Sequence, residues 1–444
     1  MESYLGKAPC PCGKAHEATI DEILVGSGVL ARLPELVRRY NAKKPFLLCD
    51  VNAWAAAGER VQGLLQAAGI PSSLFIFPQK ALEPDEGAVG GAVMHFDESC
   101  DLIIGVGSGV INDLGKILSR ISGRRYFIVG TAPSMDGYAS ANASMSRDGL
   151  KVSLDSRSAD VIIGDTQILK NAPERMLSAG LGDMLAKYIS IAEWRIAHLV
   201  TGEYYCQAVA QLVRDALNKC VDNAEGLLRR EEAAVGAVFE GLVKSGVAMA
   251  YVEVSRPASG VEHYFSHVWD MRGLALGTPV ELHGIQCAIG MMMAVRLYAY
   301  LKTCIPDAEK ARAYVEAFSY PAWQKQLRAF IGAGAETMIA QEAKEQKYSV
   351  ERHRNRLPKI LENWGNILKI LEEELPSVET ASRLLKVLRI SEQPAALGSD
   401  REGMCLTFQA TKDIRDKYVL SRLAWDLGLM DEMLAELRKY PPLV

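Results

Sequence analysis

The 444-residue sequence lacks any apolar run of about 18 residues, the length that a membrane-spanning helix needs. Its first residues lack the basic and then apolar pattern of a secretory signal peptide. It also lacks an excess of positive charge: the formal net charge is −4, which excludes a general attraction to nucleic acid or anionic lipid. We therefore expect a cytoplasmic protein with no membrane span and no nucleic-acid partner.

The sequence also lacks the even set of cysteines that a disulfide framework needs. Its nine cysteines are mostly scattered through apolar segments, which predicts reduced, buried thiols. Only Cys10 and Cys12, with His16 nearby, form a local cluster. This cluster resembles half of a metal site, but no second ligand pair stands beside it in the sequence, so a plain N-terminal loop is the favoured interpretation.

The chain has no internal repeat or low-complexity segment, and its length exceeds that of a single hydrophobic core. In the first 170 residues, short runs rich in Ile, Val, Leu and Phe alternate with amphipathic stretches such as 53–69 and 111–123. This alternation predicts a parallel sheet with helices on both faces. The strands are expected at 45–50, 73–78, 101–107, 125–130 and 160–165.

Beyond about residue 170 the strand patterns stop, and apolar residues recur at the spacing of amphipathic helices. Pro173, near a helix start, marks the expected boundary. We therefore predict an α/β + all-α fold, with a Rossmann-like parallel-sheet domain over 1–170 and a helical metal- and substrate-binding domain over 171–444. The active site is expected in the cleft between these domains.

A glycine-rich turn follows the expected strand 101–107 and precedes a helix. Gly105, Gly107 and Gly109 allow backbone N–H groups to approach a ligand closely, and the helix N-terminus favours a pyrophosphate. The pattern departs from the standard dinucleotide fingerprint, so a simple glycine-rich turn is the alternative. Asp50 ends an earlier strand, where it is either a ribose ligand or an ordinary strand-end acid.

A second loop, 129–145, is dense in small and hydroxyl residues and contains one acid, Asp136. It leaves the carboxyl end of a strand, where open α/β sheets bind ligands. The alternative interpretation is a polar surface loop.

Three of the seven histidines, His263, His267 and His283, are clustered in one short segment. His263 and His267 are four residues apart, so in a helix they share one face. Asp183 adds a carboxylate from an apolar, glycine-flanked helical segment. One carboxylate and two imidazoles form a normal ligand set for a catalytic divalent metal. The alternative is that these histidines are ordinary core or surface residues.

Five blocks, GVGSGVINDLGK, TAPSMDGYAS, GLGDMLAK, SGVEHYFSH and LHGIQCAIGM, occur in this order along the chain. Together they resemble the glycerol-1-phosphate dehydrogenase family, within the iron-type alcohol dehydrogenase and dehydroquinate synthase superfamily. TAPSMDGYAS is the most specific block, and the resemblance to the superfamily covers most of the chain. The extended C-terminal part is most similar to the bacterial branch, often named AraM.

The resemblance implies that Asp183, His263 and His283 hold the metal, which is zinc or nickel in the family. It implies that His267 lies outside the metal ligands and contacts substrate or a proton path, so that Asp183 and His267 are the catalytic residues. Asp183, His267 and Asp136 are the implied substrate contacts. Lys187 and Arg256 are hypotheses for binding the substrate phosphate.

The resemblance also places the adenosine ribose at Asp50, where an acid favours NAD over NADP. The other coenzyme contacts that it implies are Gly109, Val110, Ile111, Asn112, Asp113, Thr131, Ala132, Pro133, Ser134 and Ser140.

These roles imply a metal-dependent, NAD(P)H-linked and reversible reduction of dihydroxyacetone phosphate to sn-glycerol 1-phosphate, an activity of phospholipid synthesis, in a homo-oligomer that we expect to be a dimer. Two alternatives stay open. One is a polyol or alcohol dehydrogenase, or a sugar-phosphate synthase, on the same scaffold. The other is a nucleotide- or metal-binding protein without catalysis.

Overall fold

A computed structural model describes residues 10–147, 150–392 and 397–439 of the chain. The chain forms two compact units: Met1–Met184 with Ala208–Val254, and Leu185–Gln207 with Ser255–Val444. The boundaries of these units differ from those of the domains expected at 1–170 and 171–444. The helical residues 208–254 belong to the sheet unit, since Phe239 approaches glycines of two strands.

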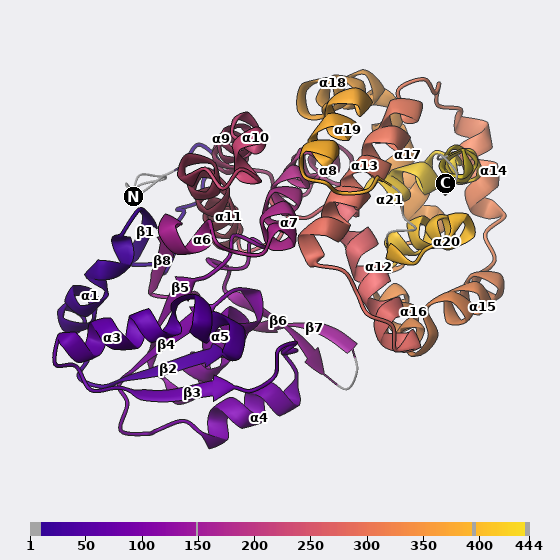
Figure 1. Ribbon diagram of the computed structural model, residues 1–444. Helices are drawn as coiled ribbons and strands as arrows, with labels where there is room; N and C mark the ends of the chain where they lie inside the picture. The colour runs from indigo at the N-terminus through magenta and orange to yellow at the C-terminus, as the bar shows by residue number, and fades with distance from the viewer. Residues whose placement is uncertain (1–9, 148–149, 393–396, 440–444) are drawn as a thin grey trace. The chain divides into compact units, whose positions relative to one another are not determined.

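The first unit is built on a parallel six-stranded sheet with the strand order β1-β8-β5-β4-β2-β3 (Figure 1). All five strands expected from the sequence are present, which confirms the predicted fold class. The sequence pattern does not predict β1 or the antiparallel hairpin of β6 and β7. The strands are β1 Glu22–Gly26, β2 Pro45–Asp50, β3 Ser73–Phe77, β4 Leu102–Gly107, β5 Arg125–Gly130, β6 Asn142–Arg147, β7 Leu150–Asp155 and β8 Val161–Asp165.

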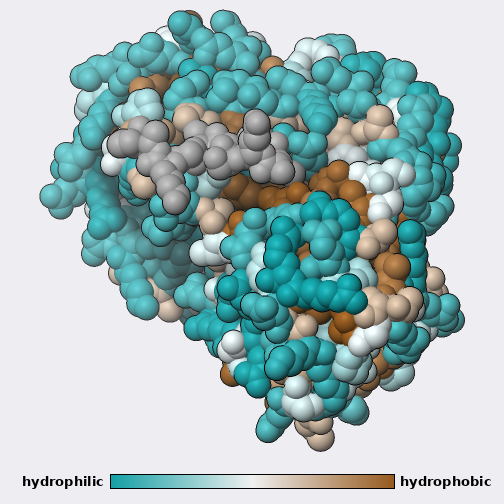
Figure 2. Space-filling view, turned by 90° about the vertical axis from the view of Figure 1, so that its left-hand side faces the viewer, coloured by the Kyte–Doolittle hydropathy of each residue, from teal (hydrophilic) through white to brown (hydrophobic). Residues whose placement is uncertain are grey.

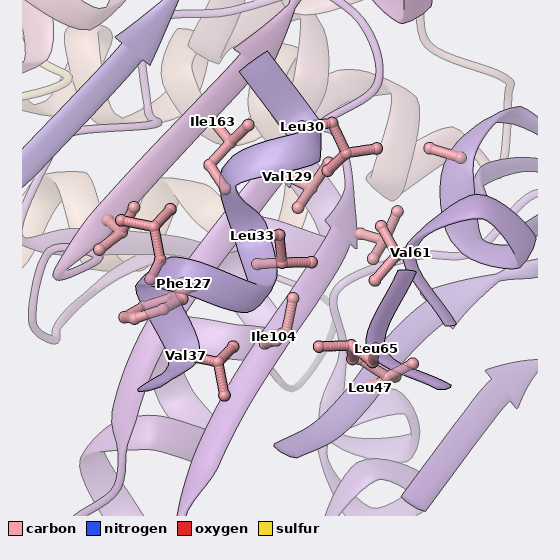
Figure 3. Packing of buried hydrophobic residues seen from close by; sticks show 14 of the residues in the cluster. Leu30, Leu33, Val37, Leu47, Val61, Leu65, Ile104, Phe127, Val129 and Ile163 are labelled. Atoms are coloured by element: carbon pink, nitrogen blue, oxygen red, sulfur yellow. The ribbon is translucent and has the colours of Figure 1, made fainter. Parts of the chain in front are cut away.

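Helices cover both faces of this sheet. On one face, Leu33 and Leu65 pack against Leu47, Ile104 and Phe127 of the strands (Figure 3). The helical elements of this unit are η1 Val29–Arg32, α1 Leu33–Arg39, α2 Val51–Ala53, η2 Trp54–Gly58, α3 Glu59–Ala67, α4 Glu86–Met94, α5 Gly109–Ser122, α6 Thr166–Leu169, α7 Glu174–Leu185, α9 Gln207–Asp222, α10 Ala224–Leu227 and α11 Glu232–Val252.

The opposite face of the sheet is covered by α5 and α11, and glycines allow the close approach. A Cβ added at Gly115 of α5 would lie 2.4 Å from the ring of Tyr126, and one added at Gly164 of β8 would lie 2.3 Å from the ring of Phe239. Any larger residue at these two positions would push a helix away from the sheet.

The direction of the strand connections reverses between β2 and β4. From β2 the chain moves outward to β3, then returns to β4 on the other side of β2 and continues to β5. Leu48 pairs with Gly105, so Asp50 and Gly107 end their strands at the same level. In open α/β sheets, such a reversal opens a ligand crevice at the carboxyl ends of the strands.

The described residues of the second unit are helical and contain no strand. Helices α12 and α13 pack against each other and carry the clustered histidines. The elements are α8 Lys187–Thr201, α12 Val261–Leu276, α13 His283–Leu301, α14 Ala308–Glu316, α15 Tyr320–Ile331, η3 Gly332–Gly334, α16 Ala335–Glu345, α17 Val350–Glu362, α18 Trp364–Glu374, α19 Val378–Val387, α20 Arg401–Thr411, α21 Leu420–Asp426 and α22 Met430–Arg438.

Two of the described helices, α11 and α13, have the length and apolar composition of a membrane span. Most of the apolar stretch of each is buried inside the protein, 67% in α11 and 83% in α13, as in the core helices of a globular fold. Hydrophilic side chains cover most of the face drawn in Figure 2. These two helices are therefore weak evidence for a membrane span.

Candidate metal and coenzyme site

The glycine-rich turn lies at the reversal point of the sheet and opens α5. Gly107 ends β4, and a Cβ added there would lie 2.6 Å from Ile111, so this position admits only glycine without a shift. Gly109 is the first residue of the 14-residue helix α5. The backbone N–H groups of the first turn of α5 therefore face the carboxyl end of the sheet, an arrangement that suits a pyrophosphate.

Asp50 ends β2 and caps the short helix α2. Its Oδ1 accepts hydrogen bonds from the N–H groups of Asn52 and Ala53, both at 2.8 Å. Because both bonds use Oδ1, capping is compatible with a hydrogen bond from a ribose hydroxyl to Oδ2. The ribose role of Asp50 stays a prediction.

A buried lysine of α5 organises the loop that follows β5. The ammonium group of Lys116 donates to the Gly137 carbonyl at 2.6 Å, the Asn142 carbonyl at 3.0 Å and the Ser140 hydroxyl at 3.1 Å. Burial lowers the pKa of Lys116, and the nearby carboxylate of Asp113 opposes this shift. The sequence offers no sign of this role, because a lone lysine in a helix normally faces solvent.

Two of the expected coenzyme residues also hold this loop. The Asn112 side chain donates to the Gly137 carbonyl at 2.9 Å, and Asp113 accepts from the Ser144 N–H at 3.2 Å. Among the others, Ile111, Ala132 and Ser134 are buried. The direct contacts of these residues with a coenzyme stay predictions.

The same loop is joined to α7 through two buried acids. The Asp136 N–H donates to Asp183 Oδ2 at 2.9 Å, and Asp136 Oδ2 accepts from the Ser245 hydroxyl at 2.9 Å. Gly180 of α7 lies directly against the Pro133 carbonyl. Asp183, which the sequence nominates as a metal ligand, is thus fixed in the last turn of α7, two residues before the chain enters the second unit.

The histidine cluster belongs to the second unit, where the rings of His263 and His283 are 5.0 Å apart. His263 Nδ1 lies 2.8 Å from Glu262 Oε1, and His283 Nδ1 lies 2.9 Å from the Ser266 hydroxyl. That hydroxyl also donates to Gln286 Oε1, so it accepts the Nδ1 proton of His283. Both rings are therefore protonated at Nδ1, so Nε2 is the nitrogen of each ring that can bind a metal ion.

His267 is the third ring of the cluster, 6.3 Å from His283. Burial lowers the pKa of His267 well below its usual value, and the positive charges of Arg415 and Lys417 lower it further. His267 is therefore neutral at physiological pH and carries one N–H and one lone pair. The pattern of histidines does not reveal Arg415 or Lys417, which lie far along the chain from it.

A second buried carboxylate lies behind Glu262. Val261 N–H donates to Glu193 Oε2 at 2.8 Å, and the Tyr298 hydroxyl donates to Glu193 Oε1 at 2.9 Å. Burial raises the pKa of both Glu193 and Glu262, and the neighbouring charge of Glu262 adds to the rise at Glu193. The carboxylate that orients His263 is thus part of a buried acidic pair.

Lys187 and Arg256, the two residues suggested to bind the substrate phosphate, already donate hydrogen bonds within the protein. Arg256 donates from Nε and Nη2 to the two carboxylate oxygens of Glu203, at 2.6 and 2.5 Å, and from Nη1 to the Tyr418 carbonyl. Lys187 is buried and donates to the Ala258 carbonyl at 3.2 Å. These contacts give both residues a structural role and disfavour the phosphate hypothesis for them.

The donor atoms of the second unit suit a divalent transition metal. The ligand atoms of His263, His283 and Cys287 lie within 4.8 Å of one another, and Cys287 Sγ is 3.5 Å from His283 Nε2. Nitrogen and sulfur donors favour zinc or nickel over magnesium or calcium. Sequence reasoning missed Cys287, although its position one turn after His283 is the pattern that places it there.

A family model described as iron-containing alcohol dehydrogenase matches residues 24–173. The NAD(P)+ glycerol-1-phosphate dehydrogenase of Halalkalibacterium halodurans is 33% identical over 65% of this chain and 73% of that protein. The enzyme of the same name from Methanosarcina acetivorans is 32% identical over 65% of this chain and 80% of its own length. The structure of a probable glycerol dehydrogenase from Sinorhizobium meliloti shares the fold, with a TM-score of 0.60 at 16% identity over 94% of this chain and 98% of that one.

Proposed function

This chain belongs to the glycerol-1-phosphate dehydrogenase family of oxidoreductases, and we propose that it catalyses the reversible, NAD(P)H-linked reduction of dihydroxyacetone phosphate to sn-glycerol 1-phosphate. Support comes from the names of the two relatives and from the orientation of the His263 and His283 rings. The observation that carries the metal dependence is that His263 Nδ1 lies 2.8 Å from Glu262 and His283 Nδ1 lies 2.9 Å from Ser266, contacts that orient the Nε2 atom of each ring as a ligand.

Asp183, His263 and His283 are the proposed metal ligands, with Zn²⁺ or Ni²⁺ as the ion. A divalent ion held there would polarise the substrate ketone and stabilise the negative charge that develops on its oxygen. Asp183 is a suitable third ligand because its carboxylate is buried and is already oriented by the Asp136 N–H.

His267 is the proposed proton-handling residue. Because its ring is neutral at physiological pH, it holds one exchangeable proton without carrying a charge that would repel a metal ion. Arg415, whose charge acts on this ring, is the proposed partner of the substrate phosphate in place of Lys187 and Arg256, because Lys417 already donates to the Ser255 and Ser259 carbonyls. Asp136 remains the proposed acid that contacts substrate hydroxyls.

The coenzyme is proposed to bind at the reversal point of the sheet, with the pyrophosphate at Gly109 and the adenosine ribose at Asp50. A carboxylate at the ribose repels a 2′-phosphate. Asp50→Ala should therefore raise the kcat/KM for NADPH relative to that for NADH; an unchanged ratio would contradict the ribose assignment. The proposal includes a homodimer in the cytoplasm.

The test is a stereochemical assay of purified full-length protein with dihydroxyacetone phosphate and NADH. We expect NADH oxidation with formation of the sn-1 product, and loss of both the catalytic metal ion and the rate in Asp183→Asn and His283→Ala. The exposed residue His95 supplies the matched control, since His95→Ala should keep both. Turnover of glycerol or another polyol, without turnover of dihydroxyacetone phosphate, would overturn the proposed substrate.

A further inference from the structure

The N-terminal cysteines lie on a tight turn of the first unit, far along the chain from the clustered histidines. The Gly13 N–H donates to the Cys10 carbonyl at 2.8 Å, and the Cys10 N–H donates to the Lys14 carbonyl at 3.2 Å. Pro11 is favoured at the second position of such a turn, and Gly13 adopts a φ of +83°. The turn brings the thiols of Cys10 and Cys12 close together.

His16 is buried and its ring is oriented toward this turn. Its Nδ1 lies 3.0 Å from the Tyr251 carbonyl, which can only accept, so Nδ1 carries the proton. The other nitrogen, Nε2, therefore offers a lone pair, and it lies 3.3 Å from Cys12 Sγ. A backbone carbonyl that fixes the tautomer of a histidine is the usual outer contact of a metal-bound imidazole.

The spacing of the donors fits a tetrahedral zinc site. With zinc–sulfur bonds of about 2.3 Å and zinc–nitrogen bonds of about 2.0 Å, the ligand atoms lie roughly 3.5–3.8 Å apart. The ligand atoms of Cys10, Cys12 and His16 are all within 4.8 Å of one another.

We propose that Cys10, Cys12 and His16, which all belong to the first unit, bind a structural zinc ion. Two thiolates and one imidazole are ligands typical of structural zinc sites. The ion would tie the N-terminal segment to the end of α11, where Tyr251 holds His16.

Metal analysis of the full-length protein tests this site separately from the catalytic one. Wild-type protein loaded with zinc should hold one more equivalent per chain than Cys10→Ser/Cys12→Ser protein, and His283→Ala should keep the N-terminal ion. Cys304→Ser, at a partly exposed cysteine, is the matched control and should lose nothing. Equal zinc content in the wild type and the double variant would overturn the proposal, whatever the activity.

A second measurement needs no variant. Native wild-type protein is treated with a thiol-alkylating reagent before and after a strong chelator, and the modified cysteines are mapped by mass spectrometry. Bound zinc should protect Cys10 and Cys12 until the chelator is added, while the modification of Cys304 should not change. If Cys10 and Cys12 are alkylated at the same rate with and without chelator, no metal is bound there and the proposal is wrong.

Discussion

At His283 a single hydroxyl decides which ring nitrogen faces the proposed metal. The single proton of the Ser266 hydroxyl is donated to Gln286, so the hydroxyl oxygen accepts from His283 Nδ1. His283 therefore carries its proton on Nδ1 and not on Nε2. Gln286 is itself fixed by a 3.0 Å bond from its amide to Asp270. Outer contacts of this kind hold a ligand in the orientation that the metal needs.

We therefore predict that Ser266→Ala lowers the affinity for Zn²⁺ by roughly 10–100-fold, the usual effect of removing such a contact. Competition with a chromophoric chelator measures this affinity. Ser266→Thr keeps the hydroxyl and should restore most of the binding. If the alanine variant binds zinc as tightly as the wild type, Ser266 does not orient His283.

At the residue scale, the sequence predicts the types of residue at the site better than their surroundings. The spacing of His263 and His283 with Asp183 suggests a metal set because these three types are common ligands. Glu262 and Ser266 look like ordinary helix residues in the sequence, because their burial and their contacts depend on how α12 packs against α13. The sequence also does not predict that the charge of Arg415 acts on His267, because this too depends on tertiary contacts.

At the scale of the element, α7 and the loop after β5 are held together by a contact that only glycine permits. A Cβ added at Gly180 would lie 1.7 Å from the Pro133 carbonyl oxygen, which is part of the backbone and cannot rotate away. We predict that Gly180→Ala destabilises the protein by about 1–3 kcal/mol and weakens NADH binding, because the loop must move. Urea unfolding and NADH titration measure the two effects.

Gly63 of α3 is the matched control for this change. A Cβ added at Gly63 meets nothing within 4 Å, so Gly63→Ala should stabilise α3 by about 0.5–1 kcal/mol, the difference between glycine and alanine in a helix. A Gly180→Ala protein as stable as the Gly63→Ala protein would show that the close approach to Pro133 is unimportant.

Helices α17 and α21 are joined by a buried ion pair. Arg356 donates from Nε and Nη2 to both oxygens of Asp426, at 2.8 Å each. Burial alone would raise the pKa of Asp426, but the charge and hydrogen bonds of Arg356 outweigh it and lower the pKa. The stabilisation from this carboxylate is therefore present above the unfolded pKa of about 3.9 and is lost as the pH falls through the lower folded pKa.

We predict that Arg356→Met costs roughly 3–5 kcal/mol at neutral pH, because Asp426 becomes a buried charge without its cation. The difference from wild type should shrink as the pH falls, because without Arg356 burial raises the pKa of Asp426, and the variant protonates this carboxylate at a higher pH than the wild type does. Urea unfolding at several pH values measures this dependence. Arg354 on the same helix makes an exposed pair with Glu316, so Arg354→Met should have a much smaller effect at every pH. A pH-independent loss in Arg356→Met would contradict the assignment.

A helix or strand can be predicted from the sequence when its own residues, and not distant contacts, determine its structure. The five expected strands are short runs rich in Ile, Val, Leu and Phe, which predict buried parallel strands without any tertiary information. β6 alternates polar residues with buried Ala143 and Met145, but it lacks the β-branched and aromatic residues typical of strands, so its strand form depends on pairing with β7. The sequence pattern of α11 also predicts a helix, but it does not predict that this helix covers the sheet.

At the scale of the whole molecule, the candidate ligands are divided between the two units. The sheet reversal, Asp50 and Gly109 belong to the first unit, and His263 and His283 belong to the second. Sequence composition predicts an α/β part followed by a helical part, but a boundary drawn along the chain cannot represent a unit that takes up a later segment, 208–254. Contacts between distant segments define such units, and periodicity does not report them.

This division predicts that coenzyme binding and metal binding fail independently. Gly109→Val places a branched side chain at the N-terminus of α5, where the pyrophosphate is proposed to bind, so the NADH dissociation constant should rise by about tenfold or more while the metal content stays unchanged. His283→Ala removes an imidazole and should abolish metal binding at the histidine cluster, leaving only the N-terminal ion, while the NADH dissociation constant changes little. NADH fluorescence titration and elemental analysis, applied to both variants, give four values. Loss of NADH binding in a folded His283→Ala protein would contradict the assignment of coenzyme and metal to separate sets of residues. A change confined to the second unit would then control a coenzyme site that we assign to the first.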